Sequence, residues 1–250
     1  MKFAYATAFA VSFGALAVAT TPASAFEIPE AGLTVTATPA VASDYLFRGI
    51  SQTRSRPALQ LTLDVEHESG FYVGAFGSNV AFAGTNARQE VDGLFGYRFG
   101  FAGLKFDIGA IYYGYPGYDK PTGGAELAYW EFGAKVAYEV PSTPVKLLAS
   151  YFYSPDFSGE TGTGHYGEVG ADISLPYAFT LSGRAGYQWI ADKVDGKSLS
   201  YGNWSVSVSR ELVAGLTLSV GYYDTDIKRS DPYNYKYVNP RAMVMLSRAF

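Results

Sequence analysis

Apolar and polar residues alternate along most of the chain. In residues 128–140, AYWEFGAKVAYEV, the side chains of Trp130, Phe132 and Val136 fall on one face of an extended backbone. Glu131 and Lys135 fall on the other face. A strand places successive side chains on opposite faces, whereas a helix would distribute these charges around its surface. The alternation therefore predicts a β-strand with one apolar and one charged face.

About twelve segments share this pattern, and each has roughly the 9 to 14 residues that a tilted strand needs to cross a bilayer. The clearest are residues 57–67, 90–99, 104–113, 144–153, 167–177, 178–190, 201–212, 215–223 and 241–250. Beyond residue 25 no apolar run approaches the roughly 18 residues of a spanning helix. The pattern predicts an all-β protein, a transmembrane up-and-down antiparallel β-barrel of about 12 strands.

The connections between these segments alternate in length. The short ones are residues 68–70, 100–103, 141–144, 176–178 and 213–215. The longer ones are mostly polar and comprise residues 51–57, 84–87, 115–124, 154–164, 191–200 and 227–239. Barrels of the bacterial outer membrane have tight periplasmic turns and longer outer loops. Twelve strands with both ends in the periplasm require five turns and six loops, as found.

The first residues suggest export. Lys2 precedes an apolar run, and the triplet Ala23-Ser24-Ala25 follows it, which is typical of a secretory signal peptide cut after Ala25. The expected division is a signal peptide at 1–25 and a barrel at 26–250, located in the outer membrane of a Gram-negative cell. Loss of Lys2 changes the net charge from -4 to -5, one cation fewer. This balance gives no reason to expect nucleic acid as a partner.

Two further features concern chemistry and assembly. The chain contains no cysteine, which excludes disulfides and thiol chemistry, and no motif indicates a cofactor. Phe250 ends the final segment, and barrels of this class characteristically carry a terminal phenylalanine that the assembly machinery reads. We therefore expect outer-membrane lipid and the barrel assembly machinery as partners. Arg248 departs mildly from that signal and is tolerable if it snorkels to the interface.

The polar faces of the strands predict a charged lumen. Such charges should pair across strands or contact lumen water, because a lone buried charge is costly. Their role is either to satisfy the lumen of any such barrel or to form a constriction that favours cations slightly. The pore-lining candidates are Asp44, Arg48, Asp64, Asp92, Arg98, Lys105, Asp107, Glu131, Lys135, Glu139, Glu168, Asp172 and Arg184, with Glu66 beside them.

Residues 43–53, SDYLFRGISQT, carry Asp44 and Arg48 four positions apart. In a first strand the two would lie about 13 Å apart on the lumen face, too far to pair with each other. Tyr45 and Phe47 would then face lipid near the outer interface. Arg241, on the last strand, is one candidate partner for Asp44 across the seam where the barrel closes.

An enzyme is the least favoured class. Hydrolytic sites need a base that other groups orient, and the chain has 2 histidines. His67 falls beside a short turn, whereas His165 would lie near the outer mouth without a recognisable nucleophile motif. We expect no catalytic, cofactor or metal residues.

Residues 43–53, together with 57–80 and the motifs EVDGLFGY and YYGYPG, resemble the TorF family, bacterial proteins classed as porins and catalogued as being of unknown function. The resemblance covers residues 34–250. It implies an outer-membrane barrel and a pore, but it brings no established substrate and no catalytic residues.

Two functions from different classes follow. The first is a porin, a passive diffusion channel for small hydrophilic solutes through a narrow charged lumen. The alternative is a non-conducting barrel that acts as receptor, adhesin or envelope scaffold through its outer loops. The tyrosine-rich residues 115–124 and 230–239 motivate the alternative, because tyrosine is favoured at binding surfaces.

Overall fold

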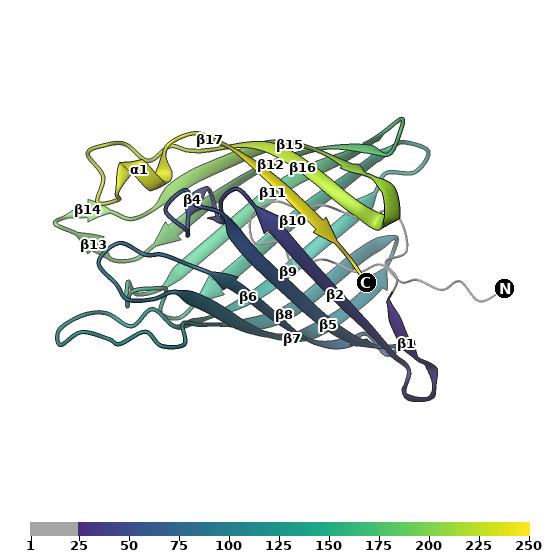
Figure 1. Cartoon of the computed structure of the whole chain (residues 1–250), viewed down its shortest axis with the longest axis horizontal. Helices are drawn as coiled ribbons and strands as arrows, with labels where there is room; N and C mark the ends of the chain where they lie inside the picture. Colours follow the sequence, from purple (N-terminus) through teal and green to yellow (C-terminus); the bar gives the residue numbers. More distant parts are fainter. Residues whose placement is uncertain (1–24) are drawn as a thin grey trace.

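Twelve antiparallel strands form a closed barrel in the computed structural model, which describes residues 25–250 (Figure 1). Neighbours in sequence pair around the wall, and β2 closes the ring by pairing with both β5 and β17. The barrel strands are β2 (Leu33–Ala42), β5 (Ala58–His67), β6 (Phe71–Asn79), β7 (Gln89–Phe101), β8 (Leu104–Gly114), β9 (Tyr129–Glu139), β10 (Val145–Ser154), β11 (Gly164–Leu175), β12 (Phe179–Ile190), β15 (Tyr201–Glu211), β16 (Leu216–Thr225) and β17 (Arg241–Arg248). The predicted twelve-stranded up-and-down barrel is confirmed.

The two faces of each strand differ as the alternation predicts. On β7, Phe95 is 51% exposed whereas Asp92 is 1% exposed, and on β9 Trp130 is exposed whereas Glu131 is buried. Apolar side chains therefore cover the outer wall, where lipid would solvate them, and the charged side chains face inward. No helix within residues 25–250 is long and apolar enough to span a membrane.

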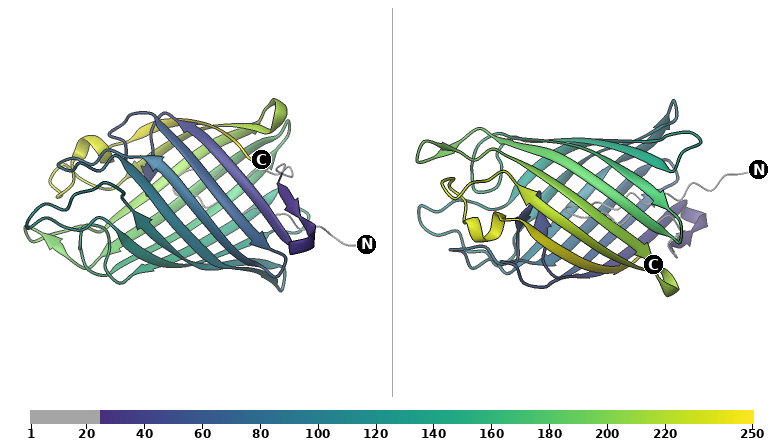
Figure 2. Two further views of the ribbon diagram at one scale, coloured as in Figure 1. Left: turned by 60° about the horizontal axis from the view of Figure 1, so that its bottom comes forward. Right: turned by 90° about the horizontal axis from the view of Figure 1, so that it is seen from above.

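The two ends of the barrel carry different connections (Figures 1 and 2). One end has five short turns, the C-terminus and a small strand, β1 (Phe26–Ile28), that pairs with β2. The other end has six longer connections, and three of them contain structure of their own. These are the hairpins β3 (Leu46–Phe47) with β4 (Ile50–Ser51) and β13 (Lys193–Val194) with β14 (Lys197–Ser198), and the helix α1 (Tyr235–Val238). We call the ends the turn mouth and the loop mouth.

The seam between β2 and β17 is short. Its ladder joins only residues 40–42 to residues 245–247, although each strand is longer than that. Two backbone hydrogen bonds between Ala37 and Phe250 extend it, at 3.1 and 2.9 Å. Phe250 thus contributes to closure through its backbone, and its side chain lies 44% exposed, under the guanidinium of Arg248.

Residues 43–53 were expected to belong to the first strand, but they lie beyond its end. β2 ends at Ala42, and residues 43–57 form the first connection of the loop mouth. The expectation that Tyr45 and Phe47 face lipid is therefore wrong. Tyr45 is 2% exposed, and Phe47 packs against buried hydrophobic residues inside the barrel. The cause is local. Arg48 and Gly49 both adopt positive φ, at 49° and 83°, which is the backbone of a tight two-residue hairpin turn rather than of a strand.

Candidate pore and its constriction

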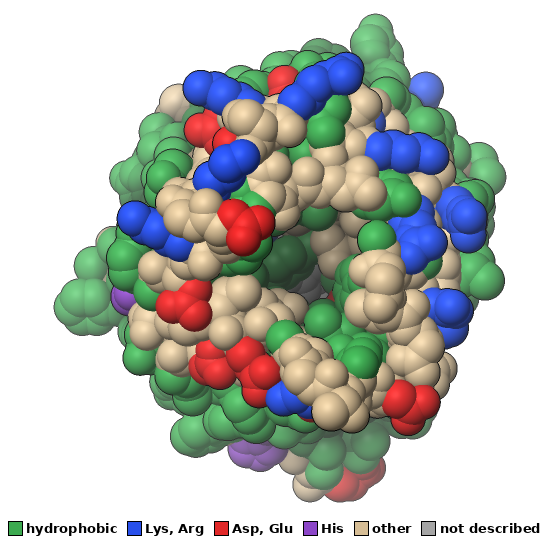
Figure 3. All heavy atoms as spheres, turned by 90° about the vertical axis from the view of Figure 1, so that its left-hand side faces the viewer, with side chains coloured by type: hydrophobic (Ala, Val, Ile, Leu, Met, Phe, Trp, Pro, Cys, Tyr) green, Lys and Arg blue, Asp and Glu red, His purple; other side chains and the backbone are tan. Residues whose placement is uncertain are grey.

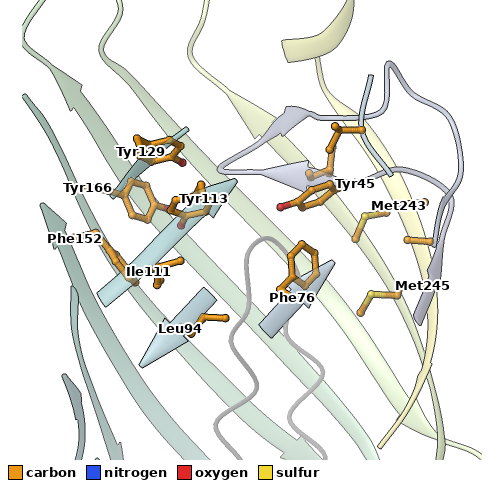
Figure 4. Packing of buried hydrophobic residues seen from close by; sticks show 14 of the residues in the cluster. Tyr45, Phe76, Leu94, Ile111, Tyr113, Tyr129, Phe152, Tyr166, Met243 and Met245 are labelled. Carbon is orange, nitrogen blue, oxygen red and sulfur yellow. The ribbon is translucent and has the colours of Figure 1, made fainter. Parts of the chain in front are cut away.

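The β3–β4 hairpin folds into the bore of the barrel. Its tip packs against the wall at β16, because a Cβ on Gly49 would lie 2.6 Å from Cγ2 of Thr225. Its other face packs against β6 and β8, where Tyr45 contacts the ring of Phe76 at 5.7 Å and Phe47 contacts that of Tyr113 at 6.0 Å. Figure 4 shows Tyr45 beside Phe76, with Tyr113, Tyr129 and Tyr166 grouped nearby. The hairpin therefore contacts strands on both sides of the lumen.

Arg48 anchors the hairpin to the wall. Its Nη1 and Nη2 donate to Oε1 and Oε2 of Glu131 on β9 at 2.9 and 2.7 Å, a two-pronged ion pair. Nη1 also donates to Oε1 of Gln188 on β12. The amide nitrogen of Gln188 donates in turn to two backbone carbonyl oxygens, so its orientation is fixed. One arginine thus joins the hairpin to two separate strands.

Aromatic rings enclose the Arg48 guanidinium. Its central carbon lies 4.0 Å from the ring centroid of Tyr166 and 4.5 Å from that of Phe47, distances at which a cation is attracted to a ring face. Burial by itself would lower the pKa of Arg48, but the carboxylate of Glu131 outweighs it and raises the pKa above the ordinary arginine value. Arg48 therefore remains charged at every working pH.

The base of the hairpin is fixed by Asp44. Its Oδ1 accepts hydrogen bonds from the hydroxyls of Ser51 and Thr53 at 2.7 and 2.6 Å. Its Oδ2 accepts from Nη1 of Arg241 on β17 at 2.9 Å. The predicted pair between Asp44 and Arg241 is present, and Asp44 and Arg48 do not pair with each other. Arg54 holds the same segment to the next loop through the backbone oxygens of residues 81 and 82.

Tyr45 connects the hairpin to a further carboxylate, and a second carboxylate lies beside that one. Its hydroxyl donates to Oε1 of Glu90 on β7 at 2.6 Å. Burial, and then the neighbouring Glu90, raises the pKa of Tyr45 well above its ordinary value, so the phenol keeps the proton that it donates. Asp92 lies two residues along the same face of β7, and within residues 25–250 no side chain donates a hydrogen bond to its carboxylate.

A cavity of about 250 Å³ opens above the hairpin, toward the loop mouth. We call it the vestibule. All six connections of the loop mouth, or strand ends beside them, contribute to its lining. Eight of the sixteen lining residues are aromatic: Phe47, Phe82, Tyr113, Tyr115, Tyr129, Phe157, Tyr201 and Tyr233. Figure 3 looks into this mouth and shows a hollow with hydrophobic side chains in its depth and charges of both signs around its rim.

A second ionic group lies below the hairpin, nearer the turn mouth. Arg98 on β7 pairs with both oxygens of Asp64 at 2.9 Å and with Glu66 at 2.6 Å, and its guanidinium stacks on Tyr72 at 3.8 Å. The Tyr72 hydroxyl donates to Oδ1 of Asp107 at 2.8 Å. Lys135 lies 3.5 Å from the other oxygen of Asp107. These charges pair across strands, as a low-dielectric wall requires.

Two glycines create the space for Tyr72. A Cβ on Gly96 of β7 or on Gly109 of β8 would lie 2.7 Å from the Tyr72 hydroxyl oxygen, well inside van der Waals contact. The register pairs these two glycines directly. The ring of Tyr72 can therefore lie flat against the wall, and this places its hydroxyl at Asp107 and its face under Arg98.

Of the thirteen predicted lining residues, Asp44 and Arg48 lie on the hairpin segment and the other eleven lie on the inner faces of barrel strands. Besides the pairs above, Lys105 binds Glu139 at 2.7 Å, Arg184 binds Asp172 at 2.6 Å, and Glu168 accepts from the Tyr166 hydroxyl at 2.8 Å. Sequence reasoning missed Glu90 and Gln188. Both fall at inward positions of the alternation, but neither stood out without the hairpin that they contact.

The histidines lie away from these groups. His165 is on the outer wall, where its ring contacts Tyr153 and Trp189 and its Nδ1 lies 2.6 Å from the Tyr151 hydroxyl. His67 bonds to Ser69 in the turn beyond β5. Within residues 25–250 no group of three or more histidine, aspartate or glutamate side chains is arranged to hold a metal ion.

The comparisons with known proteins agree with this architecture. A family model described as "Bacterial protein of unknown function (Gcw_chp)" matches residues 27–250. The chain belongs to this family. No curated protein matches the sequence.

Among solved structures, the KdgM porin aligns with a TM-score of 0.58 at 9% identity, covering 86% of this chain and 99% of the porin. The NanC porin aligns with a TM-score of 0.55 at 10% identity, covering 86% of this chain and 98% of that porin. An outer membrane channel from Pseudomonas putida F1 aligns with a TM-score of 0.51 at 11% identity, covering 88% of this chain and 96% of the channel. At these identities the likeness shows a shared fold.

Proposed function

We propose that this Gcw_chp protein is an outer-membrane porin that lets small hydrophilic solutes diffuse through a narrow charged lumen. The observation that carries the proposal is the inner wall. Charged side chains from β5, β7, β8, β9, β11 and β12 line it in cross-strand pairs, and an apolar outer wall surrounds it. The shared fold with KdgM and NanC supports the same conclusion.

The β3–β4 hairpin is the constriction of this channel. Because Arg48 and Tyr45 tie it to β9, β12 and β7, solutes must pass beside it or displace it. Charges of both signs border the path, and the sign in excess at the constriction would set the ion preference. The thirteen lining candidates act here, with Arg48 and Glu131 at the narrowest level and the Arg98 group below.

Several properties accompany this function as proposals. Residues 1–25 act as a signal peptide, but residues 1–24 lie outside the described part of the chain. The loop mouth faces the exterior, and Phe250 is read by the assembly machinery. The residues at 43–53 support placing the chain in the TorF family as well. One KdgM structure is described as a complex with oligogalacturonate; acidic oligosaccharides are therefore one solute class to include in assays.

Planar bilayer recording tests the proposal. The purified barrel should give discrete conductance steps in salt solution, and a reversal potential under a salt gradient should reveal its ion preference. A barrel that stays sealed at every voltage, with or without the hairpin, would contradict the porin and leave the receptor or scaffold alternative. Reconstituted liposomes that swell in neutral sugars of increasing size would report the size limit for solutes independently.

A further inference from the structure

The vestibule has an unusual combination of lining groups. Its aromatic rings contact one another, with Tyr113 and Tyr129 stacked at 4.3 Å and Phe157 against Tyr129 at 4.9 Å. Glu90 is the one charged side chain among the lining residues, and no lysine or arginine lines the cavity. Pockets of this kind, largely apolar with few polar groups, are typical small-molecule sites. The lining therefore favours a solute with an apolar body.

The carboxylates beside the vestibule lack a counter-charge. Glu90 is 2% exposed and accepts a hydrogen bond from Tyr45, but within residues 25–250 it forms no ion pair with a cationic side chain. Asp92, 1% exposed and directly across the β7–β8 ladder from Tyr113, forms no hydrogen bond or ion pair with another side chain in that range. A carboxylate buried without a partner takes up either a proton or a cation, so a bound cation would hold this site in its charged form.

Aromatic rings supply the second attraction. The face of an aromatic ring carries negative charge density, and several rings around one position form a cage that favours organic ammonium ions. Because the described residues hold no set of ligands for a metal, an organic ammonium ion fits the site better than a metal ion. The remaining polar groups of the lining are neutral: Gln52, Ser158, Thr161 and the hydroxyls of its tyrosines.

We propose that the vestibule is a binding site for small organic ammonium ions with an apolar body, held by the aromatic rings and the carboxylate of Glu90, with Asp92 buried behind it. The inference rests on the proposed function, because it names a solute class that the pore would capture at its outer mouth. Captured ions would wait above the hairpin, at the entrance to the constriction.

Three probes of similar size and different charge test the site. Phenethylammonium, 2-phenylethanol and phenylacetate are titrated calorimetrically into the full-length barrel in detergent micelles, with empty micelles subtracted. Phenethylammonium should bind at least about tenfold more tightly than the alcohol, which corresponds to one cation–π and carboxylate contact. Phenylacetate should bind most weakly.

Two matched variants locate the effect. Glu90→Gln should remove the preference for the ammonium ion, whereas Glu139→Gln, at the turn mouth and paired with Lys105, should leave it unchanged. Because Glu90→Gln could alter packing, Asp92→Asn serves as a second variant and should reduce the preference as well. Equal binding of the three probes, or ammonium binding that neither variant weakens, would overturn the inference.

Conductance separates this inference from the proposed function. Phenethylammonium added at the loop mouth should reduce the current reversibly at concentrations near its calorimetric Kd. A barrel that conducts but binds the three probes equally leaves the porin intact and refutes the vestibule site. A barrel that prefers the ammonium ion but never conducts supports the vestibule site and refutes the porin.

Discussion

The guanidinium of Arg48 and the carboxylate of Glu131 form a two-pronged ion pair of 2.9 and 2.7 Å, although 83 residues separate them in the chain. Arg48 is at the tip of the first loop and Glu131 is on β9, five strands around the wall from β2 along one direction. The pair therefore crosses the lumen. This contact turns a loop that could lie outside the barrel into part of its interior.

Removing the Arg48 side chain should widen the channel. In Arg48→Ala the hairpin loses its bonds to both β9 and β12, so we expect single-channel conductance to rise about twofold or more, as release of a charged constriction predicts. Planar bilayer recording measures it. Arg56→Ala is the matched control, because Arg56 is exposed in the same loop. Equal conductance in wild type and Arg48→Ala would mean that the hairpin does not limit the current.

The ion pair between Arg48 and Glu131 should also contribute to the free energy of unfolding. Arg48→Ala leaves the buried carboxylate of Glu131 without its partner, which typically costs about 3–5 kcal/mol. Adding Glu131→Gln removes that charge, so the double variant should be more stable than Arg48→Ala alone, with a coupling of about 2 kcal/mol. Urea unfolding in lipid vesicles measures both values. Tryptophan fluorescence reports the transition, because the side chains of Trp130, Trp189 and Trp204 lie exposed on the outer wall. Additive effects would exclude a direct contribution of the pair.

The glycines beneath Tyr72 give a packing prediction. Gly96→Ala or Gly109→Ala places a methyl group 2.7 Å from the Tyr72 hydroxyl and closer still to a backbone oxygen of the neighbouring strand, so both the ring and the strand backbone must shift. We expect a loss of about 1–3 kcal/mol, the usual cost of overpacking. Thermal unfolding followed by electrophoretic mobility measures it. Gly93→Ala on the same strand is the control, because no atom lies within 4 Å of its added Cβ.

A rim contact has a defined pH dependence. Lys120 and Glu160 join two long loops at 2.7 Å, and this hydrogen bond lowers the pKa of Glu160 and raises that of Lys120. The contact is therefore complete at neutral pH and is lost as the pH falls through the lowered pKa of Glu160, below the ordinary glutamate value of about 4.3. Carbon-13 NMR of the Glu160 carboxyl should show this titration. In Lys120→Ala the pKa should return toward the ordinary value, and an unshifted wild-type titration would contradict the contact.

The barrel itself could be predicted from sequence because its signal is periodic and redundant. Each strand repeats the same contrast, as between Trp130 and Glu131, and connection lengths give an independent count. The constriction could not be predicted from the sequence, because the hairpin depends on contacts between residues far apart in the chain. Residues 43–53 contain alternating aromatic and charged residues that a strand would also contain. Only the positive φ of Arg48 and Gly49 distinguishes the hairpin, and an arginine gives little local sign of that backbone.

The partner of Asp44 could be predicted, because it depends only on which strands meet when the barrel closes. Closure of an up-and-down barrel must bring its first and last strands together, so Arg241 was a candidate whatever the details of the first loop. The partners of Arg48 could not be predicted in this way, because they lie on β9 and β12, which are not neighbours of the first strand in the barrel.

The bond between Asp44 and Arg241 also sets an order in time. Arg241 is on the last strand, so this contact at the base of the hairpin can form only once that strand has joined β2. The other bonds of the hairpin, to β7, β9 and β12, do not involve the last strand. Closure of the wall and full anchoring of the hairpin are therefore coupled, and a molecule whose last strand fails to dock would lack one of the bonds that hold the hairpin in the bore.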